Sequence, residues 1–327
     1  MNRIRIFGIL LLLLVAILLP SCVQVTNLET AKPLLVAQAD AAGLTYNGEV
    51  WLFGGLGTSD HDILNCTQIF SPSTGWRLGT DMPIPCWGSC AAELDGIAYF
   101  YGGIDEKGNE MSSCEALDLT NSIWSPKTST PFAFRGSNAV AVPDMHKIFI
   151  FVDNKVYAFD PTGNSGMGSY IRMADSPVSR RWTTCGLVNI DGELRIYHIG
   201  GICVTSVQHK DLKVNYYYRP VQNDWSDPQA EAPYPADGQT GREGSVYGGT
   251  KLIYGFGEIE GKRFFRDLYI YNASTNKFST LLAIGTPRDG VNSSVINGIL
   301  YVMGGRNTMP FTGGLDLNES FNLENPP

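Results

Sequence analysis

Histidine is scarce in this chain of 327 residues, and its scarcity excludes several kinds of metal enzyme. The four histidines are scattered along the sequence: His61, His146, His198 and His209. A copper-radical oxidase needs several His and Tyr ligands around one metal, so this class is excluded. Zinc is not expected either, because three residues separate Cys86 from Cys90, a C-x-x-x-C spacing, and no histidine lies near them in sequence. We therefore expect no metal and no cofactor.

Basic residues are outnumbered, with 24 Lys and Arg against 32 Asp and Glu and a net charge of −8. An acidic protein of this kind is not expected to bind nucleic acid or an anionic lipid surface. The sequence also has no low-complexity stretch, no flexible linker and no complete catalytic motif.

Only one long apolar run is present, at residues 6–19 after Arg3 and Arg5. Its fourteen residues would cover about 21 Å as a helix, which is short of the ~30 Å of a membrane core. We interpret residues 1–21 as a signal peptide that is removed on export, which leaves 22 basic and 32 acidic side chains and a net charge of −10.

The end of this segment, Leu19-Pro20-Ser21-Cys22, resembles a bacterial lipobox, in which Cys22 becomes the lipidated first residue. Proline two positions before the cysteine departs from that motif, and plain secretion is the alternative. We expect a periplasmic or cell-surface lipoprotein, or a secreted protein. A lipid on Cys22 would be its single link to a membrane.

Six short apolar runs end in a Gly-Gly pair or in a degenerate form of one. The first residues of these endings are at positions 54, 102, 152, 200, 256 and 304, so the steps are 48, 50, 48, 56 and 48 residues. A period of about 50 residues predicts a propeller with one four-stranded blade per repeat.

Aromatic residues and tight turns keep the same period. An aromatic follows five of the endings: Trp76, Trp124, Tyr170, Trp225 and Phe278. Dipeptides suited to type I′ hairpin turns precede five of them: Asn47-Gly48, Asp95-Gly96, Asp191-Gly192, Gly248-Gly249 and Asn297-Gly298. An apolar strand ending in Gly-Gly, a Tyr-rich strand and then a Trp resemble the kelch repeat, over residues 33–327. The resemblance implies an all-β, six-bladed kelch-type β-propeller, a fold for which binding is the default function.

One domain is expected over residues 22–327. The blades are predicted at about 34–82, 83–131, 132–176, 177–232, 233–286 and 287–327. The last repeat ends before its outer strand, so we expect residues 23–32 to complete it, with Val23 to Thr30 beside Glu319 to Glu324. This pairing would close the ring, and deletion of residues 23–32 should destabilise the whole domain.

Cysteine parity favours disulfides in an exported chain. If Cys22 carries lipid, six candidates remain: Cys66, Cys86, Cys90, Cys114, Cys185 and Cys203. Cys185 and Cys203 are expected near one end of the same hairpin, and Cys66 and Cys114 are equivalent in adjacent repeats. The alternative is that these cysteines are buried free thiols.

Strand direction predicts where a ligand would bind. The connections from second to third strands and from one blade to the next share one side of a propeller, which we call the looped face. Seven of the twelve arginines after residue 21 fall in these connections: Arg135, Arg180, Arg181, Arg242, Arg263, Arg288 and Arg306. They suggest a mouth for a carboxylate or another anion, although arginines repeated from blade to blade can instead bond backbone carbonyls. Our candidate binding residues are Arg135, Arg181, Arg242, Glu243, Arg288 and Arg306. In the third repeat the connection is only Asp153-Asn154, which predicts a notch there.

The leading hypothesis is an exported binding module whose looped face holds a protein or glycan partner. The alternative is a mutarotase or epimerase for an acidic sugar such as a sialic acid, similar to periplasmic kelch propellers, with arginine on the sugar carboxylate and Glu243 beside Arg242 for proton transfer. A structural role for a lipid-tethered propeller is a third hypothesis. We assign no catalytic residue. A closed, convergent pocket would favour the enzyme, and a broad, uneven face would favour a macromolecular partner.

Overall fold

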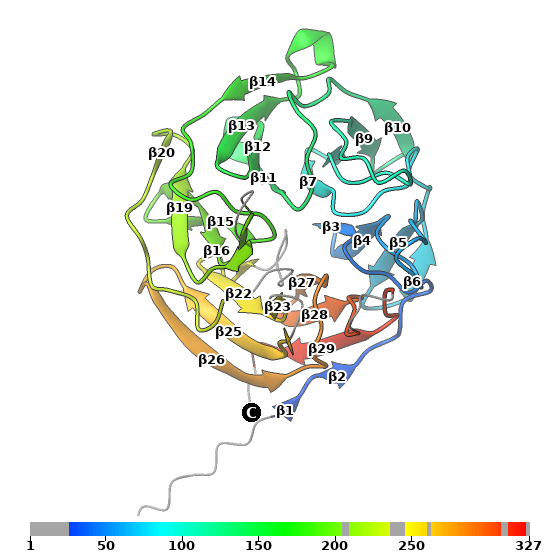
Figure 1. Ribbon diagram of the computed structural model, residues 1–327, viewed down its shortest axis with the longest axis vertical. Helices are drawn as coiled ribbons and strands as arrows, with labels where there is room; N and C mark the ends of the chain where they lie inside the picture. Colours follow the sequence, from blue (N-terminus) through cyan, green and yellow to red (C-terminus); the bar gives the residue numbers. More distant parts are fainter. Residues whose placement is uncertain (1–25, 205–208, 236–245, 260–262, 309–312, 325–327) are drawn as a thin grey trace, which may run out of the picture.

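A computed structural model describes residues 26–204, 209–235, 246–259, 263–308 and 313–324. In these residues the chain forms eight sheets, of which six are arranged as a ring (Figure 1) and two are short hairpins, with two short 3-10 helices and no α-helix. The predicted six-bladed, all-β propeller is confirmed. Within the same residues, no helix combines the length and the apolar character that a membrane crossing requires.

The first three blades each have four antiparallel strands in chain order, and the first strands β3, β7 and β11 lie nearest the centre of Figure 1. The strands of blade 1 are β3 (Ala42–Tyr46), β4 (Glu49–Phe53), β5 (Thr67–Ser71) and β6 (Gly75–Leu78). Those of blade 2 are β7 (Cys90–Leu94), β8 (Ile97–Tyr101), β9 (Cys114–Asp118) and β10 (Ile123–Pro126). Those of blade 3 are β11 (Asn138–Val142), β12 (Lys147–Val152), β13 (Lys155–Asp160) and β14 (Ser169–Arg172), with 3-10 helices η1 (Pro143–Met145) and η2 (Asn164–Gly166) in its turns.

The last three blades follow the same plan with additions. Blade 4 has β15 (Thr184–Ile190), β16 (Glu193–Ile199), β19 (Asn215–Arg219) and β20 (Asp224–Trp225). Blade 5 has β21 (Val246–Tyr247), β22 (Lys251–Gly255), β25 (Asp267–Asn272) and β26 (Lys277–Ile284). Blade 6 has β27 (Asn292–Ile296), β28 (Ile299–Met303) and β29 (Asn318–Asn322), and its fourth strand is β2 (Glu29–Thr30) from the start of the described chain.

The core lies between neighbouring blades. Because each sheet is covered on both faces, inner strands are near-continuous apolar runs, as in β12, where five of six residues are buried. Phe53 of blade 1 meets Phe100 of blade 2 edge-on, with ring centroids 4.4 Å apart. Phe151 of blade 3 packs in the same way on Tyr218 of blade 4, at 5.9 Å. The short period of the sequence therefore produces six similar interfaces around one ring.

The predicted hairpin turns are confirmed. Both central residues have positive φ in each, for example Asn47 (49°) with Gly48 (73°), and Asn297 (50°) with Gly298 (75°). These values match type I′ turns, whose twist suits the strands they join. In blade 3 the turn is instead the 3-10 helix η1, followed by His146 with φ 48°.

The N-terminal segment spans two blades. β2 pairs antiparallel with β29, with Glu29 opposite Ser320 and Thr30 opposite Glu319. The preceding strand β1 (Thr26–Asn27) pairs instead with β26 of blade 5, parallel to it. The expectation that this whole segment lies beside residues 319–324 is therefore wrong for residues 26 and 27, and residues 23–25 lie outside the described residues.

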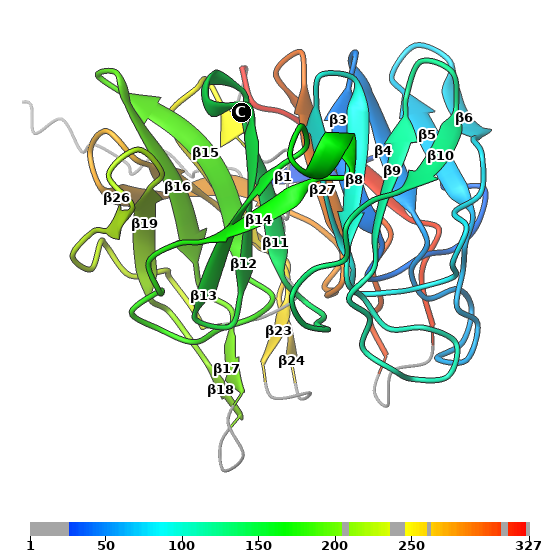
Figure 2. The ribbon, with the colours of Figure 1, turned by 90° about the horizontal axis from the view of Figure 1, so that it is seen from above.

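The looped face is uneven. Two hairpins extend from it below the blades in Figure 2. They are β17 (Ile202–Val204) with β18 (His209–Asp211) from blade 4, and β23 (Glu258–Ile259) with β24 (Arg263–Phe264) from blade 5. Blade 3, by contrast, joins β12 to β13 through Asp153 and Asn154 alone.

Leu28, between β1 and β2, is 7% exposed and packs with Phe321 and Leu323 of blade 6 and Leu281 of blade 5. We predict that Leu28→Ala lowers the free energy of unfolding by about 2–5 kcal/mol, because it leaves a cavity at the seam between the two blades. Leu35→Ala is the matched control, since Leu35 is 56% exposed and should change stability by less than about 0.5 kcal/mol. Chemical denaturation followed by tryptophan fluorescence measures both. Equal effects of the two substitutions would contradict the role of Leu28.

Candidate functional site

A chain of main-chain hydrogen bonds joins the blades at the looped end of the channel. Two residues before the first strand, five blades have a residue with φ between 51° and 67°: Asp40, Gly88, Gly136, Trp182 and Gly290. The amides of four of them donate to the carbonyl of the residue before each in the ring, from Asp40 to Gly290, Gly88 to Asp40 and Gly136 to Gly88 (2.9 Å each), and from Trp182 to Gly136 (2.7 Å). We call these residues the mouth ring. The corresponding residue of blade 5 lies outside the described residues.

The residue just before each mouth-ring residue lies on the looped face, in the connection from one blade to the next. Among the described blades these residues are Ala39, Trp87, Arg135, Arg181 and Asp289. Sequence analysis selected Arg135 and Arg181 but missed Trp87 and Asp289. The signal was available, because all five lie at one position of the repeat.

Two tryptophans and an arginine form the centre of the site. The indoles of Trp87 and Trp182 are nearly parallel, with centroids 6.4 Å apart, and the guanidinium of Arg135 lies 5.8 Å from the Trp87 ring. The ring of Trp182 lies against Gly136, where an added Cβ would collide with Cε2 of the indole. Glycine is therefore required at position 136, both because of the positive φ and because the indole of Trp182 leaves no room for a Cβ.

An open cleft of about 400 Å³ begins at Trp87 and runs between the long connections of blades 1 and 2. Apolar Ile63 and Ile104 line it together with Trp87. Its rim carries both signs of charge, from Asp60, Asp105, Glu106, Lys107 and Arg135. The cleft can hold an apolar or aromatic group with polar groups of either charge around it.

Arg135 and Arg181 are brought together by a shared acid. Arg181 binds Asp153 with two hydrogen bonds (2.8 and 3.1 Å) and donates to Glu110 at 3.0 Å. The same carboxyl oxygen of Glu110 lies 3.6 Å from Nε of Arg135, whose side chain is 43% exposed. The charge of Arg181 is thus balanced by Asp153 and Glu110, and Arg135 is the more accessible of the two cations.

Arg306 lies in a buried acidic group. Its Nη2 is 3.1 Å from a carboxyl oxygen of Asp40, and its Nε is 3.3 Å from one of Asp289. Burial raises the pKa of Asp289 to about 7, with Asp40 and Glu258 adding to the effect and Arg306 opposing it. This arginine faces carboxylates of its own chain rather than an open pocket.

Arg288 is a structural residue. It is fully buried and donates to the carbonyls of Gly304 (2.8 Å), Thr286 (2.9 Å) and Val302 (3.1 Å), and to the carboxylate of Glu319 (2.5 Å). The expectation that it binds a ligand is corrected, because every nitrogen of its guanidinium is bonded inside blade 6. Arg242 and Glu243 lie outside the described residues, so their place in a site stays a prediction.

The expected disulfides are not present. None of the six candidates forms a disulfide in the structure: Cys66, Cys86, Cys90, Cys114, Cys185 and Cys203. Cys185 is fully buried in β15 with its Sγ 3.3 Å from Nε2 of His198, whereas Cys203 lies in the projecting β17. Chiefly through burial, the pKa of Cys66 and that of Cys86 rise to about 11 and that of Cys114 to about 12, which keeps these thiols protonated. Within the described residues no His, Cys, Asp and Glu side chains group as a metal site would require.

Comparisons with known proteins agree with this architecture. A protein of Arabidopsis thaliana named as an F-box/kelch-repeat protein is 25% identical to the chain over 111 residues. Over the aligned residues, the chain is similar to a kelch-repeat protein. The aligned part is 33% of this chain and 28% of the plant protein, so the chain matches less than a third of that relative's length. No family model matches the chain.

The acidic group around Arg306 predicts a pH dependence of stability. The pKa of Asp289 in the folded chain, about 7, is above its ordinary value of 3.8, so the folded state binds this proton more tightly than the unfolded state. The resulting stabilisation is complete below about pH 4 and is lost as the pH rises toward 7. We predict that the free energy of unfolding falls over this range more steeply in the wild type than in Asp289→Asn.

Asp105→Asn is the control. Hydrogen bonds from the Asn109 amide lower the pKa of Asp105, so the stability that Asp105 contributes has the opposite pH dependence and is lost as the pH falls. Denaturation of the three proteins at intervals between pH 4 and 8 makes the comparison. Parallel curves for the wild type and Asp289→Asn would show that Asp289 does not titrate in this range.

Proposed function

We propose that the chain is a binding module that engages a protein partner through the looped face of its kelch-type propeller. The cleft at Trp87 carries the proposal. It combines an aromatic platform, an accessible arginine and a rim of mixed charge, and tryptophan and arginine are the side chains most enriched at the energetic centres of protein interfaces.

The shape of the face supports a macromolecular partner. The hairpins β17–β18 and β23–β24 project from blades 4 and 5, while blade 3 has only two residues between its second and third strands (Figure 2). A partner that reaches from the cleft to these hairpins would cover several blades, as the area of a specific protein interface requires.

The charges favour this function over the acidic-sugar enzyme. Of the five candidate arginines, Arg181, Arg288 and Arg306 each face a carboxylate of this chain. Three compensated arginines do not provide the net positive site that an acidic sugar needs. Export through residues 1–21 and a lipid on Cys22 belong to the proposal as sequence-based expectations, since both segments lie outside the described residues.

Site-specific photo-crosslinking tests the proposed face. A photoreactive amino acid at Lys107, on the rim of the cleft, should give a discrete protein adduct in cells that express the full chain. The same residue at Ser122, in the turn between β9 and β10 on the opposite side of the blade, is the matched control and should give none. Trp87→Ala should abolish the adduct at residue 107 without lowering the thermal midpoint by more than a few degrees. Adducts at both positions, or an adduct that persists in Trp87→Ala, would contradict the proposal.

A thermal-shift panel separates the alternative. Neutral oligosaccharides, small carboxylates and sialic acid are each added to the mature domain, and a ligand at one hundred times its Kd should stabilise it by roughly 2.7 kcal/mol. We expect no shift with the acidic sugar. A shift that Arg306→Ala removes would replace the protein partner by a small-molecule site and direct work to the mutarotase reaction.

A further inference from the structure

Arg180 is a buried arginine without a carboxylate partner among the described residues. Its side chain is 5% exposed, and its Nη1 donates to the carbonyl of Val214 at 3.1 Å. Its Nη2 is buried and has no hydrogen-bond partner in the described structure. Burial lowers the pKa of Arg180 to about 10, and the groups that oppose this shift are the Cys185 thiol and the Tyr216 phenol.

Arg288 of blade 6 shows what such an arginine requires. Arg180 and Arg288 each lie two residues before a mouth-ring residue, so they occupy the same position in their blades. The third strands match as well, since Asn215 pairs with Ile199 and Asn318 with Met303, each the last residue of its second strand. Tyr216 of blade 4 is therefore the counterpart of Glu319.

The exchange of glutamate for tyrosine removes the counter-charge. Glu319 accepts a hydrogen bond from Arg288 at 2.5 Å, whereas in blade 4 the guanidinium of Arg180 lies 5.6 Å from the centre of the Tyr216 ring. A buried cation that lacks its anion is destabilising by several kcal/mol in general. Blade 4 thus needs a negative charge that its own residues at this position do not supply.

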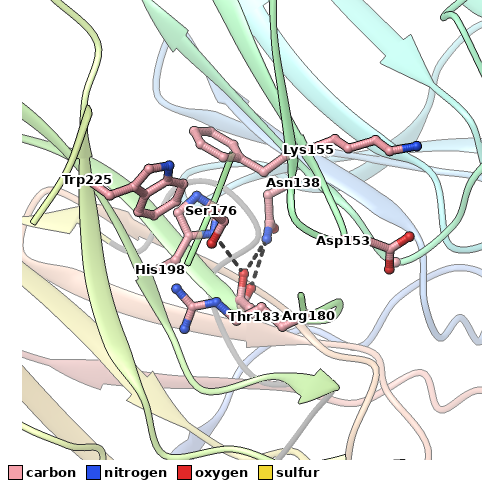
Figure 3. Close-up of a pocket in the computed structure, with 10 residues that line it drawn as sticks. Asn138, Asp153, Lys155, Ser176, Arg180, Thr183, His198 and Trp225 are labelled. Atoms are coloured by element: carbon pink, nitrogen blue, oxygen red, sulfur yellow. Dashed lines mark hydrogen bonds between the residues drawn. The ribbon is translucent and has the colours of Figure 1, made fainter. Parts of the chain in front are cut away.

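A small cavity of about 10 Å³ lies beside Arg180, between blades 3 and 4 (Figure 3). Asn138 donates to Oγ1 of Thr183 at 2.5 Å, and this hydroxyl is 3.2 Å from Nδ1 of His198. Burial and the charge of Arg180 hold the pKa of His198 far below its ordinary value, so the imidazole is neutral and adds no competing charge. The cavity is therefore lined mainly by polar groups, and the two cations among its described residues are Arg180 and Lys155.

The one carboxylate that lines this cavity among the described residues, that of Asp153, is already paired with Arg181. Asp153 lines it, but both carboxyl oxygens accept hydrogen bonds from Arg181, and in Figure 3 the carboxylate is turned away from Arg180. The two-residue connection at Asp153 and Asn154 leaves this side of blade 3 uncovered by a longer loop. Lys155, which lines the cavity, is exposed, so the cavity borders the surface next to this short connection.

We propose that Arg180 holds a small anion in this cavity, either chloride or one oxygen of a carboxylate group. The volume matches a single water-sized occupant and excludes a sugar or a phosphate. The anion would supply Arg180 with the negative charge that Glu319 supplies to Arg288. The site is separate from the cleft at Trp87, so it stands or falls independently of the proposed protein partner.

The test exploits the match between the two blades. Thermal midpoints of the full chain are measured at constant ionic strength while a bulky organic sulfonate is replaced by chloride, or in a second series by acetate. We expect the wild-type midpoint to rise by about 5 °C at saturation. Tyr216→Glu, which builds the blade 6 pair into blade 4, should show no dependence on either anion. Lys277→Gln, which removes an exposed cation of blade 5 that does not line the cavity, is the control and should keep the wild-type response.

Arg180→Gln covers the case in which Tyr216→Glu does not fold, because it removes the cation and should also be insensitive to anions. Crystals grown with bromide should show anomalous density beside Nη2 of Arg180. A response to acetate without one to chloride would still support the site and would identify a carboxylate as its natural occupant. Two results would overturn the proposal: an equal anion response in the wild type and Arg180→Gln, or a crystal in which one water bridges Arg180 and Oδ1 of Asn138 while the wild type ignores both anions.

Discussion

The mouth ring is the constraint on which the rest of the molecule depends. Four main-chain hydrogen bonds link residues from five blades, and they fix where each first strand begins. The left-handed backbone of the ring explains why three of its five residues are glycines. It also suits Asp40, because aspartate tolerates this conformation better than most residues. Trp182 is the exception, at a cost of roughly 1–2 kcal/mol, which its contact with Gly136 and its stacking near Trp87 offset. Side chains at the mouth are therefore oriented by backbone geometry before any side-chain interaction forms.

The ring also sorts adjacent arginines into different roles. Arg180 and Arg181 are neighbours in sequence, yet Arg180 is directed into blade 4 and Arg181 faces the acids at the mouth. The same alternation separates Arg288, inside blade 6, from Asp289 at the mouth. Because one residue of displacement decides between a structural and a surface role, a count of arginines on one face overestimates the positive charge available to a ligand.

The sequence allowed the fold to be predicted because its signals are local. Spacing of the Gly-Gly endings sets the blades, and dipeptides such as Asn47-Gly48 set the turns. The site was less predictable, because it depends on contacts between distant residues: Arg288 meets Glu319 across 31 positions, and Arg306 meets Asp40 across the closure of the ring. Disulfides could not be predicted from parity, since an even number of thiols says nothing of distances between them. The pairing of Thr26–Asn27 with blade 5 depends on two-residue strands, for which the sequence has no distinctive pattern.

The unequal connections on the looped face also remove the symmetry of the propeller. Six similar blades would offer an attached molecule six equivalent orientations, each related to the next by one blade. The two-residue connection of blade 3 lies beside blade 4, whose hairpin projects, and blade 5 with its own hairpin comes next. A rotation by one blade would therefore place a hairpin where the short connection had been. A molecule bound to this face would consequently fit in only one orientation about the propeller axis, because the other five would bring a hairpin and the short connection into the wrong places.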